Sequence, residues 1–375
     1  MQTTLRPYHP ALNALGLIIM IFGLLMGFPL AVSAWVGDGA TLAYDQALFV
    51  TFVAGLLLWG ATRTERRDLR VHDGFLLVAA TWVVLPLFGA LPLLAYIPEL
   101  RFTDAYFEAV SGLTATGATV LTGLDDLPVS INLWRTFMHW VGGMGVIVLV
   151  VAILPLLGIG GMQVYKAETP GPMKETKLTP RIAQTAKYLW LLYTGLTGIC
   201  IVALHLAGLD WYDAVLHAFT TVALAGFSSR DASIAGFQSQ TVELVLMAFM
   251  MIAVLNFTTH FTALRQRSLK VYVRDTGVFA AWTAILGSGL VLAFYLWWNG
   301  VYQDIPTALR HAGFNTVSLA TSSGYMSTDY DQWPIFAPMW MMFLAAIASS
   351  AGSTGGGIKM IRVLILVKQA GLELK

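Results

Sequence analysis

Uncharged stretches long enough to cross a membrane recur along the chain. A transmembrane helix needs about 20 consecutive apolar residues. Eight uncharged runs meet or approach this length: 11–37, 46–62, 74–98, 136–165, 188–209, 244–264, 276–303 and 332–358. They predict an all-α polytopic membrane protein. The first run is longer than the apolar part of a signal peptide, which favours an uncleaved span.

Three shorter uncharged runs lie between these spans. They cover residues 109–124, 214–229 and 311–328, and they are rich in Gly, Ser and Thr. Because they are too short and too polar for spans, we expect re-entrant segments that enter the membrane and return to the same side.

Composition narrows the class of protein. Charged residues make up 11% of the chain, against about 25% in soluble domains. This excludes a soluble enzyme, a disordered chain and, with a net charge of +1, a nucleic-acid binder. The single cysteine, Cys200, excludes a disulfide framework and a cysteine metal cluster.

The positions of the basic residues predict an orientation. With a cytoplasmic N-terminus and re-entrant short runs, 18 of the 22 Lys and Arg lie inside. The outside keeps only Arg101, Arg135, Arg230 and Arg310, together with 14 of the 21 Asp and Glu. These acidic residues indicate either a vestibule that attracts cations or ordinary solvated loops.

A unit of span, short run and span repeats three times from residue 74 onward. Aligned without gaps, a hydroxyl residue stands six positions before a glycine each time. The pairs are Ser111 with Gly117, Thr220 with Gly226, and Ser318 with Gly324. Each run follows an acidic residue that suits a helix N-terminus, namely Asp104, Asp210 and Asp304.

Such a repeat is typical of a cation path. A half-helix entering from outside points its negative C-terminal end at the membrane centre. The returning chain then has free carbonyl oxygens that replace the water around an ion, and glycine permits the backbone angles this requires. The alternative is that the glycines only allow close helix packing, which does not explain three copies in register.

Four motifs carry a resemblance to a known family. They read SGLTATGATV from Ser111, HWVGGMGV from His139, AGFSSRDAS from Ala225 and AGSTGGGIK from Ala351. The chain resembles the potassium-uptake translocation subunits of the Trk type, within the Trk/Ktr/HKT superfamily. The two extra spans before the first repeat resemble the arrangement in the Trk branch of this superfamily rather than that in the Ktr branch.

The resemblance implies four span–half-helix–span units around one pore, each with one filter segment. It implies that backbone carbonyls of three segments coordinate K⁺: Ala115, Thr116 and Gly117; Leu224, Ala225 and Gly226; Ser322, Ser323 and Gly324. It also implies that a glycine-rich loop beneath the filter is a gate, formed by Gly352, Ser353, Thr354, Gly355, Gly356 and Gly357. A phosphate-binding loop is the alternative, but the required Gly-Lys-Ser/Thr spacing is missing.

The expected domains are 1–73 with two extra spans, then pore units 74–165, 166–264 and 265–375. The fourth unit implied by the resemblance is absent. We expect a C-terminally truncated chain that conducts poorly on its own. A natural three-unit protein and completion by another chain are the alternatives.

The predicted function is potassium uptake across the bacterial inner membrane. A sodium or non-selective cation transporter, an intramembrane enzyme and a non-conducting structural subunit are the alternatives. An intramembrane enzyme would need paired acids, histidines or a serine–lysine pair within the spans, and no such pairing is evident. Coupling to protons or sodium stays open. The expected partners are membrane lipid, a second copy of the chain and, from the resemblance, a cytoplasmic nucleotide-binding regulatory subunit.

Overall fold

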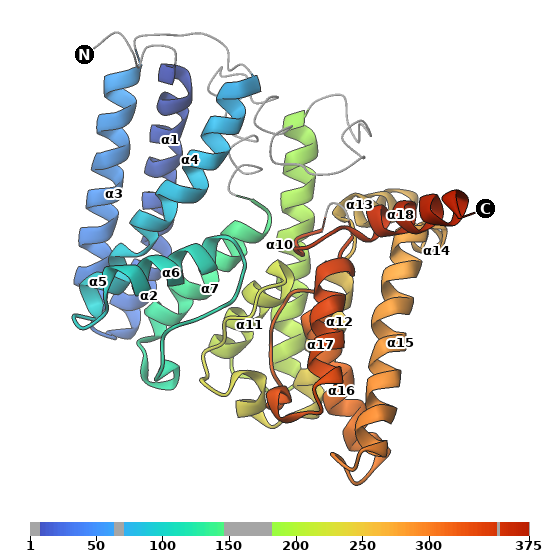
Figure 1. Cartoon of the computed structure of the whole chain (residues 1–375). Helices are drawn as coiled ribbons and strands as arrows, with labels where there is room; N and C mark the ends of the chain where they lie inside the picture. The colour runs from blue at the N-terminus through green and yellow to red at the C-terminus, as the bar shows by residue number, and fades with distance from the viewer. Residues whose placement is uncertain (1–7, 64–70, 146–181, 351–352, 375) are drawn as a thin grey trace. The chain divides into compact units, whose positions relative to one another are not determined.

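The structure is a computed structural model that describes residues 8–63, 71–145, 182–350 and 353–374 (Figure 1). These residues form α-helices and short 3₁₀ turns with no strand. The prediction of an all-α protein is therefore confirmed. The chain forms two compact units. The N-terminal unit holds residues 1–114 and 118–190, and the C-terminal unit holds 115–117 and 191–375.

The N-terminal unit begins with closely packed helices. They are α1 (His9–Leu25), α2 (Gly27–Val36), α3 (Thr41–Thr62), α4 (Val71–Gly89) and α5 (Leu91–Tyr96). Two glycines allow α1 and α3 to touch. A Cβ atom built on Gly16 would lie 2.7 Å from the Trp59 nitrogen, and one on Gly55 would lie 2.7 Å from the Gly16 carbonyl oxygen. Any side chain at either position would push the two helices apart.

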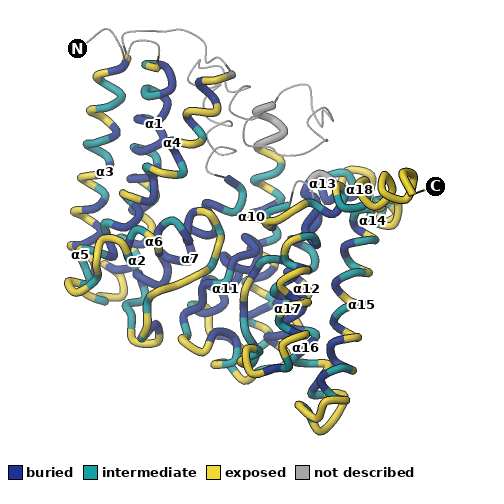
Figure 2. Tube along the Cα trace, in the orientation of Figure 1, coloured by how far each residue is buried: buried dark blue, intermediate teal, exposed yellow. Residues whose placement is uncertain are grey.

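The second part of this unit contains α6 (Phe102–Leu113), a 3₁₀ turn (Leu124–Asp126) and α7 (Val129–Gly143). Helix α7 is buried along most of its length (Figure 2). A Cβ atom on Gly142 would overlap the Leu113 carbonyl group. The glycine therefore lets α7 pack against the end of α6.

A polar contact joins the turn between α2 and α3 to the start of α7. The Asp38 carboxylate accepts hydrogen bonds from the backbone N–H of Ser130 at 2.8 Å and from that of Ala40 at 3.2 Å, and another from the Ser33 hydroxyl. Partial burial acts to raise the pKa of Asp38, but these hydrogen bonds outweigh it and hold the pKa below its ordinary value of 3.8.

The boundary between the two units follows Trp190 and so lies within helix α10 (Ile182–Leu206). The C-terminal unit then contains α11 (Trp211–Ala223), a 3₁₀ turn (Ser233–Phe237), α12 (Gln240–Ala253), α13 (Phe257–Gln266), α14 (Lys270–Arg274), α15 (Thr276–Trp298), α16 (Ile305–Ala320), a 3₁₀ turn (Tyr330–Gln332), α17 (Phe336–Ile347) and α18 (Met360–Glu373). Leu292 and Leu296 of α15, Ala308 and Ala312 of α16, and Met341 of α17 share one buried apolar cluster.

Five helices in the described part of the chain are long and apolar enough to cross a membrane. They are His9–Val36, Thr41–Thr62, His72–Tyr96, Lys187–Leu206 and Thr276–Trp298. Their outer faces carry exposed apolar side chains, such as Phe279, Leu286 and Phe294 on α15. Lipid chains would cover such a surface.

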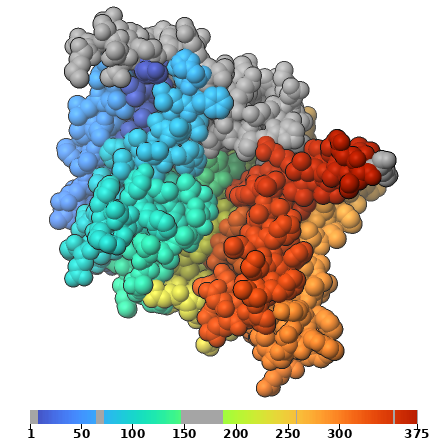
Figure 3. All heavy atoms as spheres, in the orientation of Figure 1, coloured from blue at the N-terminus to red at the C-terminus, as the bar shows by residue number. Residues whose placement is uncertain are grey.

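Five of the eight predicted spans correspond to these helices, and the other three do not. Run 244–264 is broken between Ala253 and Phe257, where the Val254 carbonyl accepts a hydrogen bond from the Ser350 N–H at 3.3 Å. In the described part of run 332–358, the α-helix is α17. Helices α17 and α18 lie on the face drawn in Figure 3. Run 136–165 begins inside α7, and residues 146–165 lie outside the described residues.

Candidate functional site

Each predicted filter segment follows a short helix, namely α6, α11 and α16. Asp210 caps α11, because its carboxylate accepts the Asp213 N–H at 2.8 Å. Asp304 caps α16 in the same way, accepting the Thr307 N–H at 2.8 Å. Asp104 instead lies in the first turn of α6. An acid therefore stands at the N-terminal end of all three half-helices, as the sequence predicts.

The backbone turns in the same way after each half-helix. Ala115, Leu224 and Ser322, each two residues before a predicted filter glycine, have positive φ angles of 55°, 55° and 63°. Non-glycine residues rarely adopt this left-handed conformation, which costs about 1–2 kcal/mol per residue. Three equivalent non-glycine residues thus share a costly conformation, which indicates a geometry imposed by the fold.

The three predicted segments converge in the C-terminal unit, which includes residues 115–117. A Cβ atom built on Gly117 would overlap the Gly226 nitrogen, and one on Gly226 would lie 2.5 Å from the Ser323 carbonyl oxygen. Gly324 has open space around it but a φ angle of 81°. Glycine is therefore required by close approach at the first two positions and by conformation at the third.

The remaining predicted filter residues occupy the same segments. Leu224, Ala225 and Ser323 are buried, Ala115 and Ser322 are half-buried, and Thr116 is exposed. Tyr325, which the sequence does not single out, follows Gly324 and is fully buried. Its hydroxyl group bonds to the hydroxyl groups of Thr220 and Thr221 on α11.

The glycine-rich loop lies against the ends of two half-helices. The Thr354 hydroxyl donates to the Val222 carbonyl of α11 at 3.2 Å, and the Gly356 N–H donates to the Ser322 hydroxyl at 3.0 Å. A Cβ atom on Gly355 would lie 3.3 Å from the Thr321 carbonyl oxygen. Of the six predicted gate residues, Gly352 lies outside the described residues.

Two further groups hold this loop. The Lys359 ammonium donates to the Gly355 carbonyl oxygen, and the Ser349 hydroxyl donates to that of Gly356. Gly357 has a φ angle of 83°, and a Cβ atom there would lie 2.7 Å from the Ala346 carbonyl oxygen. Lys359 is therefore a contact of the predicted gate, a role that its residue type alone does not indicate.

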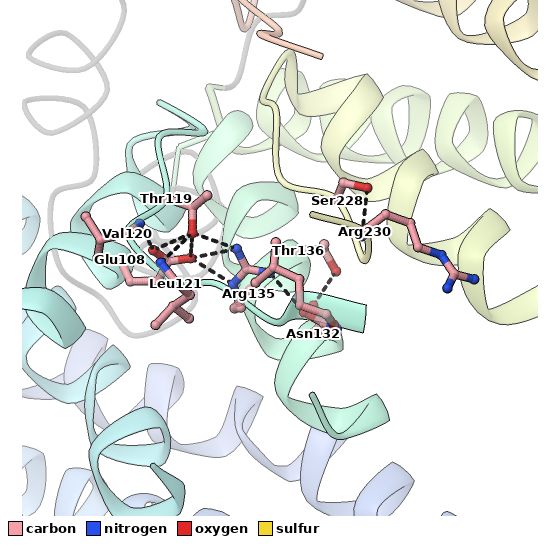
Figure 4. A network of polar contacts seen from close by, with 10 residues as sticks. Glu108, Thr119, Val120, Leu121, Asn132, Arg135, Thr136, Ser228 and Arg230 are labelled. Atoms are coloured by element: carbon pink, nitrogen blue, oxygen red, sulfur yellow. Dashed lines mark hydrogen bonds and ion pairs between the residues drawn. The ribbon is translucent and has the colours of Figure 1, made fainter. Parts of the chain in front are cut away.

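All four arginines that the sequence assigns to the outside are paired with a carboxylate. Arg135 contacts Glu108 at 2.7 Å, and neither side chain is exposed (Figure 4). The other pairs are Arg230 with Asp213 at 3.2 Å, Arg310 with Glu243 at 2.7 Å, and Arg101 with Asp104 at 2.9 Å. Each pair therefore balances the charge of its arginine, so these four arginines add little net positive charge.

No group of three or more His, Cys, Asp or Glu side chains within the described residues is placed to hold a metal ion. The predicted filter segments instead present backbone carbonyl groups and the hydroxyl groups of Thr116, Ser322 and Ser323.

Comparison with known proteins decides the family. The model of the TrkH family, described as a cation transport protein, matches residues 42–375. The chain belongs to the TrkH family of cation transport proteins. The predictions of a Trk-type resemblance and of a transporter rather than an enzyme are thereby confirmed.

Relatives within the TrkH family match nearly the whole chain. The Trk system potassium uptake protein TrkH of Escherichia coli strain K12 is 46% identical over 96% of this chain and 75% of that protein. The TrkH protein of Halomonas elongata is 45% identical with the same coverage. A crystal structure of the potassium transporter TrkH from Vibrio parahaemolyticus superposes with a TM-score of 0.86 and 40% identity, covering 100% of this chain and 76% of that one.

Proposed function

We propose that this protein takes up K⁺ across the bacterial inner membrane through a filter of backbone carbonyls. The observation that carries the proposal is the convergence of Gly117, Gly226 and Gly324, each after a half-helix and a left-handed residue. The uptake of potassium named for the E. coli and Halomonas relatives supports the choice of ion.

In this proposal, residues 115–117, 224–226 and 322–324 supply the coordinating oxygens. The C-terminal ends of α6, α11 and α16 add the negative end of a helix dipole, which stabilises a cation without a fixed carboxylate. Because no full charge binds the ion, it is released readily enough to pass through.

The proposed domain layout follows the three half-helices. Residues 1–73 supply two extra spans, and residues 74–165, 166–264 and 265–375 each supply one pore unit. The proposed N-terminus is cytoplasmic, so the capped ends of the half-helices face outward, together with the acidic residues that attract cations.

The glycine-rich loop is the proposed gate. Its contacts with Val222, Ser322 and Thr321 support a position directly beneath the two half-helix ends. Any ion leaving that point would have to pass the loop, so its displacement would open the path.

The proposed assembly is a homodimer in membrane lipid that contacts a cytoplasmic nucleotide-binding regulatory subunit through the basic inner segments. The basic character of α13 and α14, with Arg265, Lys270 and Arg274, supports such a contact surface.

Growth at limiting potassium tests the function. A bacterial strain without its own potassium uptake systems should grow at low potassium when it expresses the natural gene. No growth despite protein in the membrane would contradict the proposal. Sodium uptake by these cells without potassium uptake would favour the sodium alternative.

A further inference from the structure

The three half-helices carry a repeated polar link that the sequence pattern does not show. The residue nine positions before the filter glycine is Glu108, His217 or Asn315. In each case its side chain bonds to a residue two or three positions after that glycine. We infer that these three side chains are positioning residues, which fasten the returning limb of each filter segment to its own half-helix. This inference rests on the proposed function.

The first link lies in the N-terminal unit (Figure 4). The Glu108 carboxylate accepts hydrogen bonds from the Thr119 hydroxyl at 2.9 Å and from the Val120 N–H at 3.3 Å. Arg135 donates to Glu108 at 2.8 Å and to Thr119 at 3.2 Å, and it also bonds to Asn132. The arginine neutralises the carboxylate of Glu108. Without this counter-charge, burying the carboxylate would carry a large desolvation penalty.

The second link uses a histidine. His217 Nδ1 lies 2.8 Å from the Asp213 backbone carbonyl oxygen, one turn earlier on α11, and Nε2 lies 2.9 Å from the Ser228 hydroxyl. Because a carbonyl only accepts, Nδ1 carries the proton and the Ser228 hydroxyl donates to Nε2. The Ser228 oxygen then accepts the Arg230 N–H at 3.1 Å, so the imidazole of His217 and the hydroxyl of Ser228 both have hydrogen-bond partners.

The third link uses an amide with the same anchorage. Asn315 donates to the His311 backbone carbonyl at 2.8 Å, again one turn earlier, and to the Ser327 hydroxyl at 3.0 Å. Its carbonyl oxygen accepts the Ser327 N–H at 3.3 Å, and His311 Nδ1 lies 3.1 Å from the Ser327 hydroxyl. Asn315 therefore holds both the backbone and the side chain of the returning limb.

The three links have nearly the same spacing in the sequence but differ in the chemical type of the side chain. A carboxylate, an imidazole and an amide each join the ninth residue before the glycine to the second or third residue after it, and all three side chains are buried. What the fold preserves is thus the separation between half-helix and returning limb. That separation fixes where the carbonyl groups of the intervening filter residues point, and so which ion radius they match best.

Ordinary satisfaction of buried polar groups is the competing explanation, and it predicts an effect on stability alone. A positioning role predicts a change in ion selectivity as well. The two explanations are separated by measuring uptake of rubidium, a chemical substitute for potassium, against uptake of sodium, in cells with matched amounts of protein in the membrane.

The test variants remove the links in the C-terminal unit one at a time. Asn315→Leu keeps the branching of the side chain but removes the amide, Ser327→Ala removes its partner, and His217→Leu removes the second link. The matched control is Thr316→Val, because Thr316 is the buried neighbour of Asn315 and its hydroxyl has no hydrogen-bond partner among the described residues. His217→Gln is the conservative variant, since its amide reaches the place of Nε2.

We expect each removal to lower the rubidium-to-sodium uptake ratio by about tenfold, the effect of roughly one buried hydrogen bond, and Thr316→Val to leave it unchanged. His217→Gln should restore most of the ratio. If Asn315→Leu does not reach the membrane, the milder Ser327→Ala decides. Unchanged ratios in Ser327→Ala and His217→Leu would overturn the inference. A natural protein without rubidium preference would instead contradict the proposed function itself.

Discussion

The hydroxyl group of Tyr325 lies 3.2 Å from that of Thr221 and also bonds to the hydroxyl of Thr220. Tyr325 directly follows the third filter glycine, whereas both threonines belong to α11, the second half-helix. One buried ring therefore braces one repeat against another. The proposed filter segments are held both to their own half-helices and across repeats.

Removing this brace should weaken the site. Tyr325→Phe deletes only the hydroxyl and leaves the two threonine hydroxyls short of a partner, at a cost of about 1–3 kcal/mol. We expect a lower melting temperature of the purified protein and a lower rubidium-to-sodium uptake ratio. A variant with both values unchanged would show that the contact has no role in the filter.

The close approach of two filter segments at Gly226 gives a second prediction. In Gly226→Ala, the new methyl group would lie 2.5 Å from the Ser323 carbonyl oxygen and force the segments apart. We expect normal amounts of protein in the membrane but rubidium uptake lowered by at least about tenfold. Gly287→Ala on α15 is the control, because a Cβ atom there meets no atom within 4 Å. Equal uptake by the two variants would refute the packing argument.

The buried ion pair predicts a large effect on stability. Glu108→Gln leaves the Arg135 charge buried without its counter-charge, which costs about 3 kcal/mol or more. The melting temperature should fall by several degrees. Asp104→Asn breaks the pair with Arg101, whose side chain is 80% exposed, and should lower the melting temperature much less. Similar melting temperatures for both variants would contradict this assignment.

The gate contact predicts a change in regulation. Lys359→Met removes the bond from the ammonium group to the Gly355 carbonyl and leaves the loop less firmly held. We expect increased rubidium flux into cells, because the proposed gate is held less firmly. Lys368→Met, on the exposed part of α18, is the control. Flux equal to that of the natural protein would show that Lys359 does not restrain the loop.

Acid should weaken the contact between the α2–α3 turn and α7. Since folding lowers the pKa of Asp38, this group stabilises the folded state above its unfolded value of 3.8. That stabilisation is lost as the pH falls through the lower folded value. Asp38→Asn should therefore melt below the natural protein at neutral pH and converge with it near the acid end of the range. A constant difference at all pH values would be inconsistent with this assignment.

The order of the long helices and the half-helices can be predicted from the positions of charged residues along the sequence. Uncharged runs predict the five long apolar helices of the described residues, and the repeat of hydroxyl and glycine predicts which three segments converge. The breaks do not follow, because Val254 and Leu255 are as apolar as any residue within a span. At this break the Val254 carbonyl accepts a hydrogen bond from the Ser350 N–H, a tertiary contact that the sequence pattern does not reveal.

The details of the site are less visible in the sequence. Positive φ angles at Ala115, Leu224 and Ser322 run against the preference of these residue types, so only the folded surroundings reveal them. The links from Glu108, His217 and Asn315 are hidden for another reason: three unlike side chains occupy one structural position. Comparing the repeats by sequence detects shared residue types, but it does not detect a hydrogen bond that different residue types make at equivalent positions.

Competition between ions tests the central claim most directly. Rubidium uptake by cells expressing the natural gene is measured while potassium or sodium is added outside in increasing amounts. The account predicts that potassium displaces rubidium at about equal concentration, whereas sodium in large excess leaves uptake nearly unchanged. Sodium that competes as well as potassium would contradict a potassium filter built from these three segments.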